Sequence, residues 1–387
     1  MPEGSIEKDS AGIHHFLIKK SPSCNINAAS RLLGLMYMKK KFVVASLVAT
    51  VALTLTACKS SGPKTIQLSG AGSTFVYPAM SRWVQAFSQT HPNVRINYQS
   101  IGSGGGVQQV KAGTVDFGAS DYPLMAPELA QMPPVVQIPE TAGPVCITYN
   151  LPDLKTPLKL SADVIAGIWL GKITNWQDKA IAKDNPGVNL PKEAIVVAHR
   201  SDGSGTTAAF TTYLSAVSPE WSTKVGHGGS VSWPVGLGGK GNEGVTGLVK
   251  QSPGAIGYVE LAYAIENSLP VAQVKNLAGN YITPSTETTT AAINAFTAAL
   301  DKDPRSPIVN APATAPNAYP ISTLTFLIVP KDGTNKANRE ALKSFLEYVI
   351  TDGQAVANQL HYAPLPDGVK QFDEQQIKEL TVNGQPL

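Results

Sequence analysis

The segment 199–207, His-Arg-Ser-Asp-Gly-Ser-Gly-Thr-Thr, gathers side chains that could hold a small anion. An apolar run precedes it and a run of helix-forming residues follows it, which predicts a strand, a tight turn and a helix start. The first N–H groups of a helix lack intrahelical partners, and the helix dipole favours negative charge there. Arg200 adds a planar, permanently charged donor, Ser204 and Thr206 add hydroxyl donors, and Gly205 lets the backbone approach a ligand closely. These residue types at this spacing predict an anion-binding turn.

Three further strands are expected to end in similar polar clusters. Each cluster follows an alternating or apolar run and precedes the next element, which is the α/β pattern in which ligands bind at the carboxyl ends of parallel strands. We therefore expect the clusters to lie close together at one edge of a sheet. The strands and their clusters are 65–69 with 70–75 (Gly-Ala-Gly-Ser-Thr-Phe), 94–98 with 101–106 (Ile-Gly-Ser-Gly-Gly-Gly), and 115–119 with Ser120 and Asp121.

Later elements follow from the same patterns. A helix is expected to begin only at Val107, after the glycine run, and a long glycine-rich loop is expected over 233–242. Lys240 and Asn242 are interpreted as loop residues, and Asp202 as the carboxylate partner of Arg200. Further expected elements include strands at 145–149, 254–259 and 324–329, helices at 178–183 and 243–251, and an amphipathic helix at 341–350.

Nucleotide and hydrolase motifs are incomplete. Neither glycine cluster carries the last glycine of a dinucleotide fingerprint, and no phosphate-loop motif occurs. Ser204 does not stand in a nucleophile elbow, and His199, His227 and His361 have no visible partner that would make one of them its base. We therefore expect no enzyme activity and no cofactor.

The N-terminal part carries a predicted lipoprotein signal. Residues 38–57 combine a basic start with an apolar stretch, and Leu-Thr-Ala leads into Cys58, the expected lipidation site, followed by a polar tether at 58–64. Residues 1–37 precede this complete signal, so we expect a start assigned too far upstream. The alternatives are an N-terminal transmembrane anchor or a signal that is not cleaved.

Charge and cysteine content exclude several function classes. The whole chain has a formal charge of +3, but residues 1–57 hold seven of its 31 basic and three of its 28 acidic residues, which leaves a charge near −1. We therefore expect no nucleic-acid partner. Cys146 is the one cysteine beyond residue 58 and is expected to be a buried strand thiol, and no cluster suggests a metal site.

These clusters together resemble the substrate-binding proteins of bacterial phosphate ABC transporters. The resemblance is carried by 70–75, 102–106, 115–121, 200–206, 233–242 and 253–260, and it extends from about residue 66 to about residue 366. One departure is Ser73, which stands where that family usually has alanine. By motif, the resemblance implies that phosphate is bound by Thr74, Phe75, Ser103, Asp121, Arg200, Ser204, Gly205 and Thr206, with Asp202 beside them.

The resemblance also implies the fold and the transport role. It implies a two-lobed α/β periplasmic binding protein of type II, each lobe a mixed sheet flanked by helices, with a hinge between them. Lobe I is expected at 65–141 and 320–387, and lobe II at 142–319. A monomer would capture inorganic phosphate at the periplasm or the outer face of the cytoplasmic membrane. It would deliver the ion to the membrane subunits of an ABC permease and would contact the membrane only through a lipid anchor at Cys58.

Selectivity among anions is expected to depend on Asp121. Phosphate near neutral pH keeps at least one proton, whereas sulfate has none, so an ionised carboxylate can accept a hydrogen bond only from phosphate. A site built to pair a specific donor rejects analogues that lack it by on the order of 10⁴-fold. The alternatives to a phosphate-binding protein are a binding protein for another oxyanion (sulfate, molybdate or arsenate) or a secreted phosphoester hydrolase that uses Ser204.

Overall fold

A computed structural model describes residues 65–387 of the chain. The predicted signal at 38–57, its cysteine at position 58 and the proposed early start lie outside these residues. Among the described helices, none combines the length and the apolar character needed to cross a lipid bilayer. The described residues therefore include all the predicted residues of the anion site and the strands and helices that carry them.

The first part of the chain forms three parallel strands joined by two helices. Strand β1 (Ile66–Gly72) lies between β2 (Val94–Ser100) and β3 (Phe117–Ser120), and α2 (Tyr77–Thr90) and α3 (Ser103–Lys111) connect them. The expected polar clusters therefore do follow the carboxyl ends of neighbouring parallel strands. This order brings the clusters to one edge of the sheet.

Helix α3 begins earlier than the sequence suggests. We expected it at Val107, but Ser103 and the glycines after it already form its first turn. Gly102 adopts a φ of 88°, which starts the turn, and a Cβ on Gly106 would lie only 2.5 Å from the carbonyl oxygen of Ala71. The glycines thus allow the helix to approach strand β1 closely, and this packing outweighs their poor helix propensity.

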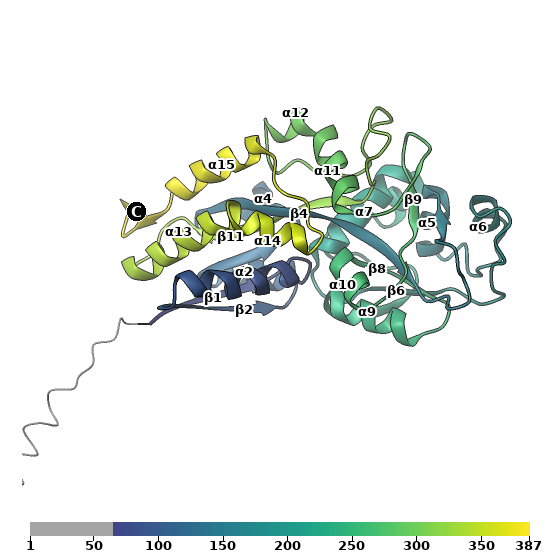
Figure 1. The fold of residues 1–387 in the computed structure, drawn as a ribbon, viewed down its shortest axis with the longest axis horizontal. Coiled ribbons are helices and arrows are strands. Elements are labelled where there is room, and N and C mark those ends of the chain that lie inside the picture. The colour runs from purple at the N-terminus through teal and green to yellow at the C-terminus, as the bar shows by residue number, and fades with distance from the viewer. Residues whose placement is uncertain (1–64) are drawn as a thin grey trace, which may run out of the picture. The chain divides into compact units, whose positions relative to one another are not determined.

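Two long antiparallel strands form the centre of an eight-stranded sheet. Strand β4 (Val135–Tyr149) pairs with β11 (Ser322–Pro330) as far as Pro144, and from Val145 it pairs with β8 (Ala255–Glu260). The sequence predicted only the second half of β4, because prolines at 139 and 144 interrupt its first half. The strand order is β2-β1-β3-β11-β4-β8-β6-β7. Figure 1 shows β4 running from the group that contains β1 and β2 to the group that contains β6 and β8.

The second half of the sheet carries the segment of Arg200. Strand β6 (Val196–Arg200) lies parallel to β8 and to the short β7 (Leu237–Gly239), and α7 (Gly205–Val217) follows it directly. The expected loop at 233–242 is partly wrong, since β7 interrupts it and α9 (Gly241–Gln251) starts at its end. A Cβ on Gly239 would lie 2.6 Å from backbone atoms of Gly244 and Val245, so glycine permits this tight strand–helix turn.

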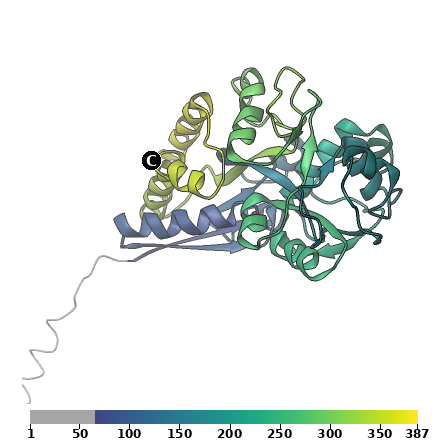
Figure 2. The ribbon, with the colours of Figure 1, turned by 45° about the vertical axis from the view of Figure 1, so that its right-hand side comes forward.

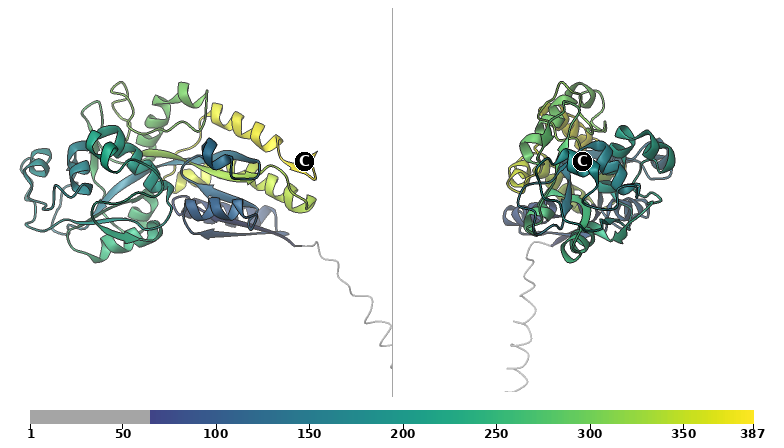
Figure 3. Two further views of the ribbon diagram at one scale, coloured as in Figure 1. Left: turned by 180° about the vertical axis from the view of Figure 1, so that it is seen from behind. Right: turned by 90° about the vertical axis from the view of Figure 1, so that its right-hand side faces the viewer.

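The remaining elements flank these strands, and segments from both ends of the described chain lie together (Figures 1 and 2). Seen from behind in Figure 3, α13 (Lys336–Ile350) and α14 (Gly353–Gln359) lie beside β1 and α2, and the teal elements form the opposite group. These remaining elements are α4 (Ala126–Leu129), β5 (Lys159–Leu160), α5 (Ala162–Trp169), α6 (Lys179–Asp184), α8 (Pro219–Lys224), α10 (Leu261–Glu266), β9 (Gln273–Lys275), β10 (Tyr281–Ile282), α11 (Thr286–Ala295), α12 (Thr297–Leu300), α13 (Lys336–Ile350), α14 (Gly353–Gln359), α15 (Asp367–Lys378), β12 (Thr381–Val382) and β13 (Gln385–Pro386).

Large aromatic side chains fill the core on both sides of the site. Trp83 of α2 is fully buried and donates a hydrogen bond from Nε1 to the carbonyl oxygen of Gly353, which joins the first part of the chain to the last. Trp169 packs edge-on against Phe210, which stacks on Tyr258. Cys146 is buried in β4, as expected for a strand thiol. These contacts hold the strand ends that carry the site in fixed positions.

Candidate functional site

Arg200 ends strand β6 and is held by Asp202. Its Nε and Nη2 donate to Oδ1 and Oδ2 of that carboxylate at 2.8 and 2.6 Å, and the guanidinium is almost completely buried. Gly241 also donates its N–H to Asp202, at 3.0 Å. Partial burial raises the pKa of Asp202. The hydrogen bonds and the positive charge of Arg200 outweigh this effect and leave that pKa below its usual value. The expected pair is therefore present, and its two hydrogen bonds fix the orientation of the planar guanidinium of Arg200.

Ser204 caps helix α7. Its hydroxyl oxygen accepts a hydrogen bond from the N–H of Thr207 at 3.0 Å, and its own hydroxyl hydrogen is not used by any described residue. The N–H of Gly205 donates to the hydroxyl of Ser103 at 3.0 Å, and the N–H of Thr206 has no partner among residues 65–387. The helix start therefore keeps donor capacity for an anion.

Thr74 and Phe75 approach from the other side, at the end of β1. The hydroxyl oxygen of Thr74 accepts hydrogen bonds from Asn242, and within the described part of the chain neither Thr74 nor Phe75 donates its backbone N–H. The ring of Phe75 is fully buried and packs edge-on against Tyr362, whose hydroxyl donates to the Phe75 carbonyl at 2.6 Å. Phe75 can therefore contribute only its backbone, as the resemblance implies.

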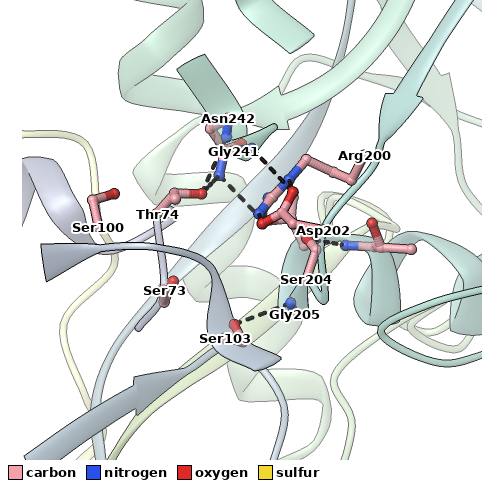
Figure 4. Close-up of polar contacts among 12 residues, drawn as sticks. Ser73, Thr74, Ser100, Ser103, Arg200, Asp202, Ser204, Gly205, Gly241 and Asn242 are labelled. Atoms are coloured by element: carbon pink, nitrogen blue, oxygen red, sulfur yellow. Dashed lines mark hydrogen bonds and ion pairs between the residues drawn. The ribbon is translucent and has the colours of Figure 1, made fainter. Parts of the chain in front are cut away.

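Ser103 joins the two sides. Its hydroxyl oxygen accepts from the backbone N–H of Asp121 at 3.3 Å and from that of Gly205 at 3.0 Å. The N–H of Gly104 donates to the carbonyl oxygen of Gly203 at 3.0 Å, which adds a second direct link. Figure 4 shows the side chains of Thr74 and Ser103 on one side and those of Arg200 and Ser204 on the other.

Asp121 is the buried carboxylate of the cluster. Its Oδ1 accepts from the hydroxyls of Ser73 and Thr325, and its Oδ2 accepts from Thr206 at 3.3 Å. Burial raises the pKa of Asp121 to about 6, although the hydrogen bond from Ser73 and the charge of Arg200 oppose the rise. At pH 7 and above this carboxyl is therefore ionised and acts as an acceptor.

Asn242 was interpreted as a loop residue, and this interpretation is wrong. It is fully buried in the first turn of α9, and its Nδ2 lies 2.8 Å from the hydroxyl oxygen of Thr74 and 3.3 Å from that of Thr206. Its Oδ1 accepts from the backbone N–H of Glu260 at 3.0 Å, which fixes the orientation of the amide. The only local signal was its position just after Gly241, at a helix start.

The eight residues implied by the resemblance lie together. Hydrogen bonds link Arg200 to Thr206, Thr206 to Asp121, and Ser103 to both Asp121 and Gly205. The residues without such a link, which are Thr74, Phe75 and Ser204, adjoin the cluster through Asn242 or through their chain neighbours. All eight lie almost entirely out of solvent in this arrangement.

The arrangement suits binding of an anion better than acid–base or metal chemistry. No histidine of residues 65–387 hydrogen-bonds to Ser204, and His199 bonds to the carbonyl oxygen of Arg200. The described residues also contain no group of three or more metal-ligating side chains. What the site offers is a fixed cation, a set of hydroxyl and amide donors, and one carboxylate.

Comparison with known proteins identifies the class and the family. Residues 59–353 match the model of the PBP superfamily domain, the class of two-lobed binding proteins that this fold represents. The chain is 46% identical over 312 residues to the phosphate-binding protein PstS of Xylella fastidiosa (strain Temecula1), covering 80% of this chain and 85% of the relative. It is 42% identical over 341 residues to PstS of Pasteurella multocida, covering 88% and 96%. The chain therefore belongs to the PstS family of phosphate-binding proteins.

A solved structure has the same fold at low sequence identity. The phosphate-binding protein from Stenotrophomonas maltophilia superposes with a TM-score of 0.61 at 20% identity, covering 79% of this chain and 92% of that one. This likeness concerns the fold, and it agrees with a two-lobed α/β binding protein.

Proposed function

We propose that this protein captures inorganic phosphate between two lobes and delivers it to an ABC permease. The observation that carries the proposal is the orientation of three hydroxyls, those of Thr74, Ser103 and Ser204. Each oxygen already accepts a hydrogen bond from a protein N–H, so its own hydrogen remains to be donated to a ligand. Such a site requires a ligand rich in acceptors, and Arg200 requires that it be an anion.

Phosphate fits this site better than oxyanions without a proton, such as sulfate, because of Asp121. An ionised carboxylate among many donors needs a partner that brings a hydrogen, and a protonated phosphate oxygen supplies one. Sulfate has only acceptors, so it would offer no hydrogen to the carboxylate and would be repelled by its charge. The names of the relatives support the same choice.

Two lobes are proposed with the boundaries expected from the sequence. Lobe I comprises 65–141 and 320–387 and carries Asp121, and lobe II comprises 142–319 and carries Arg200. The site is buried in the present arrangement, so an ion can enter only if the lobes separate. We infer a hinge in the crossing segments, near the point where β4 changes its pairing partner.

The cellular context is proposed from the same reasoning. A monomer would act outside the cytoplasmic membrane, held there by a lipid at Cys58, and would pass phosphate to the membrane subunits of the permease. We expect binding without turnover, because the site offers Ser204 no general base. Radiolabelled palmitate incorporation that is lost in Cys58→Ala would test the anchor.

Isothermal titration with phosphate tests the binding function. We expect one phosphate per chain with a dissociation constant in the micromolar range or below, about 8 kcal/mol or more. Arg200→Met is expected to abolish detectable binding, whereas Arg82→Met, at an exposed arginine of α2, is expected to leave it unchanged. Absence of phosphate binding by the unaltered protein would contradict the proposal.

A further inference from the structure

Glu140 is a buried glutamate directly behind the site. It is the extra residue of a β-bulge in β4, because the register with β11 passes from Thr325–Thr141 to Phe326–Pro139 and leaves Glu140 without a partner. Its carbonyl oxygen accepts instead from the side chain of Gln354 at 2.8 Å. Bulges beside functional sites redirect a side chain, and here the redirected group is a carboxyl.

The carboxyl of Glu140 shares one hydroxyl with Asp121. The Oγ1 of Thr325 lies 3.1 Å from Oε1 of Glu140 and 3.2 Å from Oδ1 of Asp121. Glu140 is completely buried, and its Oε2 has no hydrogen-bond partner in the described structure. The carboxyl of Glu140 thus has Thr325 as its one partner among the described residues, and Thr325 has a single hydroxyl hydrogen, which Asp121 can also accept.

A neutral Glu140 satisfies this arrangement. If both carboxyls were ionised, Thr325 could donate to only one of them, and two buried negative charges would lie close together beside a bound anion. If Glu140 carries a proton on Oε1, it donates to Thr325, which is then free to donate to Asp121. The resulting chain runs in one direction and ends on the carboxylate of the site.

We propose that Glu140 is a positioning residue whose proton holds Asp121, through Thr325, in the ionised acceptor state that a protonated phosphate oxygen requires. The proposal rests on the phosphate-binding function proposed above. It adds a residue that does not contact the ligand but controls whether Asp121 is ionised or protonated when the ligand binds.

Ionisation of the surrounding groups agrees with this assignment. Burial raises the pKa of Glu140 to about 8, although the bond from Thr325 opposes the rise, whereas the pKa of Asp121 is about 6. Burial holds the pKa of Tyr98 well above its usual value, and the charge of Glu140 adds to this rise, so Tyr98 stays neutral. Arg200 faces Asp121 and stays charged. Between about pH 6 and 8 Glu140 is therefore protonated while Asp121 is ionised.

The test is the pH profile of phosphate affinity for the whole protein, measured by titration calorimetry from pH 7 to 9.5. Phosphate remains a dianion over the upper part of this range, so a change there reports on the protein. Above about pH 8 the unaltered protein must take up one proton to bind, so its affinity is expected to fall about tenfold per pH unit. Glu140→Gln keeps a donor for Thr325 and cannot ionise, so its profile is expected to be flat.

Two further variants separate this role from a structural one. Glu140→Met provides no donor and is expected to bind phosphate about tenfold more weakly at pH 7. Asp373→Asn is the matched control: Asp373 is a buried carboxyl of α15 whose pKa burial raises well above its usual value, and it forms no hydrogen bond to any described residue. It is expected to keep the profile of the unaltered protein.

Three results would overturn the proposal. They are a flat profile in the unaltered protein, an alkaline fall in Glu140→Gln as steep as in the unaltered protein, and full affinity in Glu140→Met. Loss of phosphate binding by the unaltered protein at every pH would instead remove the proposed function itself. The Glu140→Gln profile decides the matter even if the methionine variant fails to fold.

Discussion

The side-chain nitrogen of Asn242 lies 2.8 Å from the hydroxyl oxygen of Thr74, although 168 positions of sequence separate the two residues. The same nitrogen lies 3.3 Å from the hydroxyl oxygen of Thr206. Asn242 therefore supplies hydrogens to two hydroxyls that belong to opposite proposed lobes. By occupying the acceptor side of Thr74, it leaves the hydrogen of that hydroxyl available to an anion.

Replacing Asn242 is expected to weaken phosphate binding. In Asn242→Ala both hydroxyls lose a donor, and we expect about a tenfold lower affinity. Lys240→Ala is the control, because Lys240 is two residues away and exposed. Titration calorimetry measures both, and thermal unfolding checks that the alanine variant is folded. Equal affinity of Asn242→Ala and the unaltered protein would show that the amide serves the fold alone.

Selectivity against sulfate is expected to depend on the charge of Asp121. In Asp121→Asn the side chain can donate as well as accept, so it no longer repels a fully ionised oxyanion. We expect this variant to gain sulfate affinity relative to phosphate by about a hundredfold or more. Parallel titrations with the two anions measure the ratio, and an unchanged ratio would assign selectivity to other residues.

Sulfate binding is also expected to depend on pH. The pKa of Asp121 is about 6, so below that value the carboxyl is protonated and can donate to sulfate. Because only this protonated form accepts sulfate, its affinity should rise about tenfold for each unit that the pH falls from 8 to 6, and level off below. Asp121→Asn should bind sulfate equally across this range. A sulfate affinity independent of pH in the unaltered protein would contradict the assigned role.

Gly205 is expected to tolerate no side chain in the present arrangement of the site. A Cβ there would lie 2.5 Å from Cβ and 2.6 Å from the backbone nitrogen of Asp121. Backbone atoms cannot move aside as a flexible side chain can, so the added methyl group would clash with Asp121. We therefore expect Gly205→Ala to hold the lobes apart and to lower phosphate affinity about tenfold or more. Its unfolding temperature without phosphate should change little. Gly247→Ala, which has nothing within 4 Å of the added methyl group, should bind normally.

The sequence predicts mainly those features of the site that involve residues close together in the chain. The pairing of Arg200 with Asp202 spans two positions and follows from residue types alone, and the strand-end clusters follow from the α/β pattern. The contact of Asn242 with Thr74 depends on how distant elements pack, so no local pattern contains it. Glu140 was missed for a different reason: the bulge that redirects it is set by pairing with β11.

Above all, we expect the site to bind an oxyanion that carries a proton and to reject one that does not. The most direct test of this expectation is competition between phosphate and sulfate for the unaltered protein at pH 8, where the carboxyl of Asp121 is ionised. We expect phosphate to bind on the order of 10⁴-fold more tightly than sulfate. Comparable affinities for the two anions would contradict it.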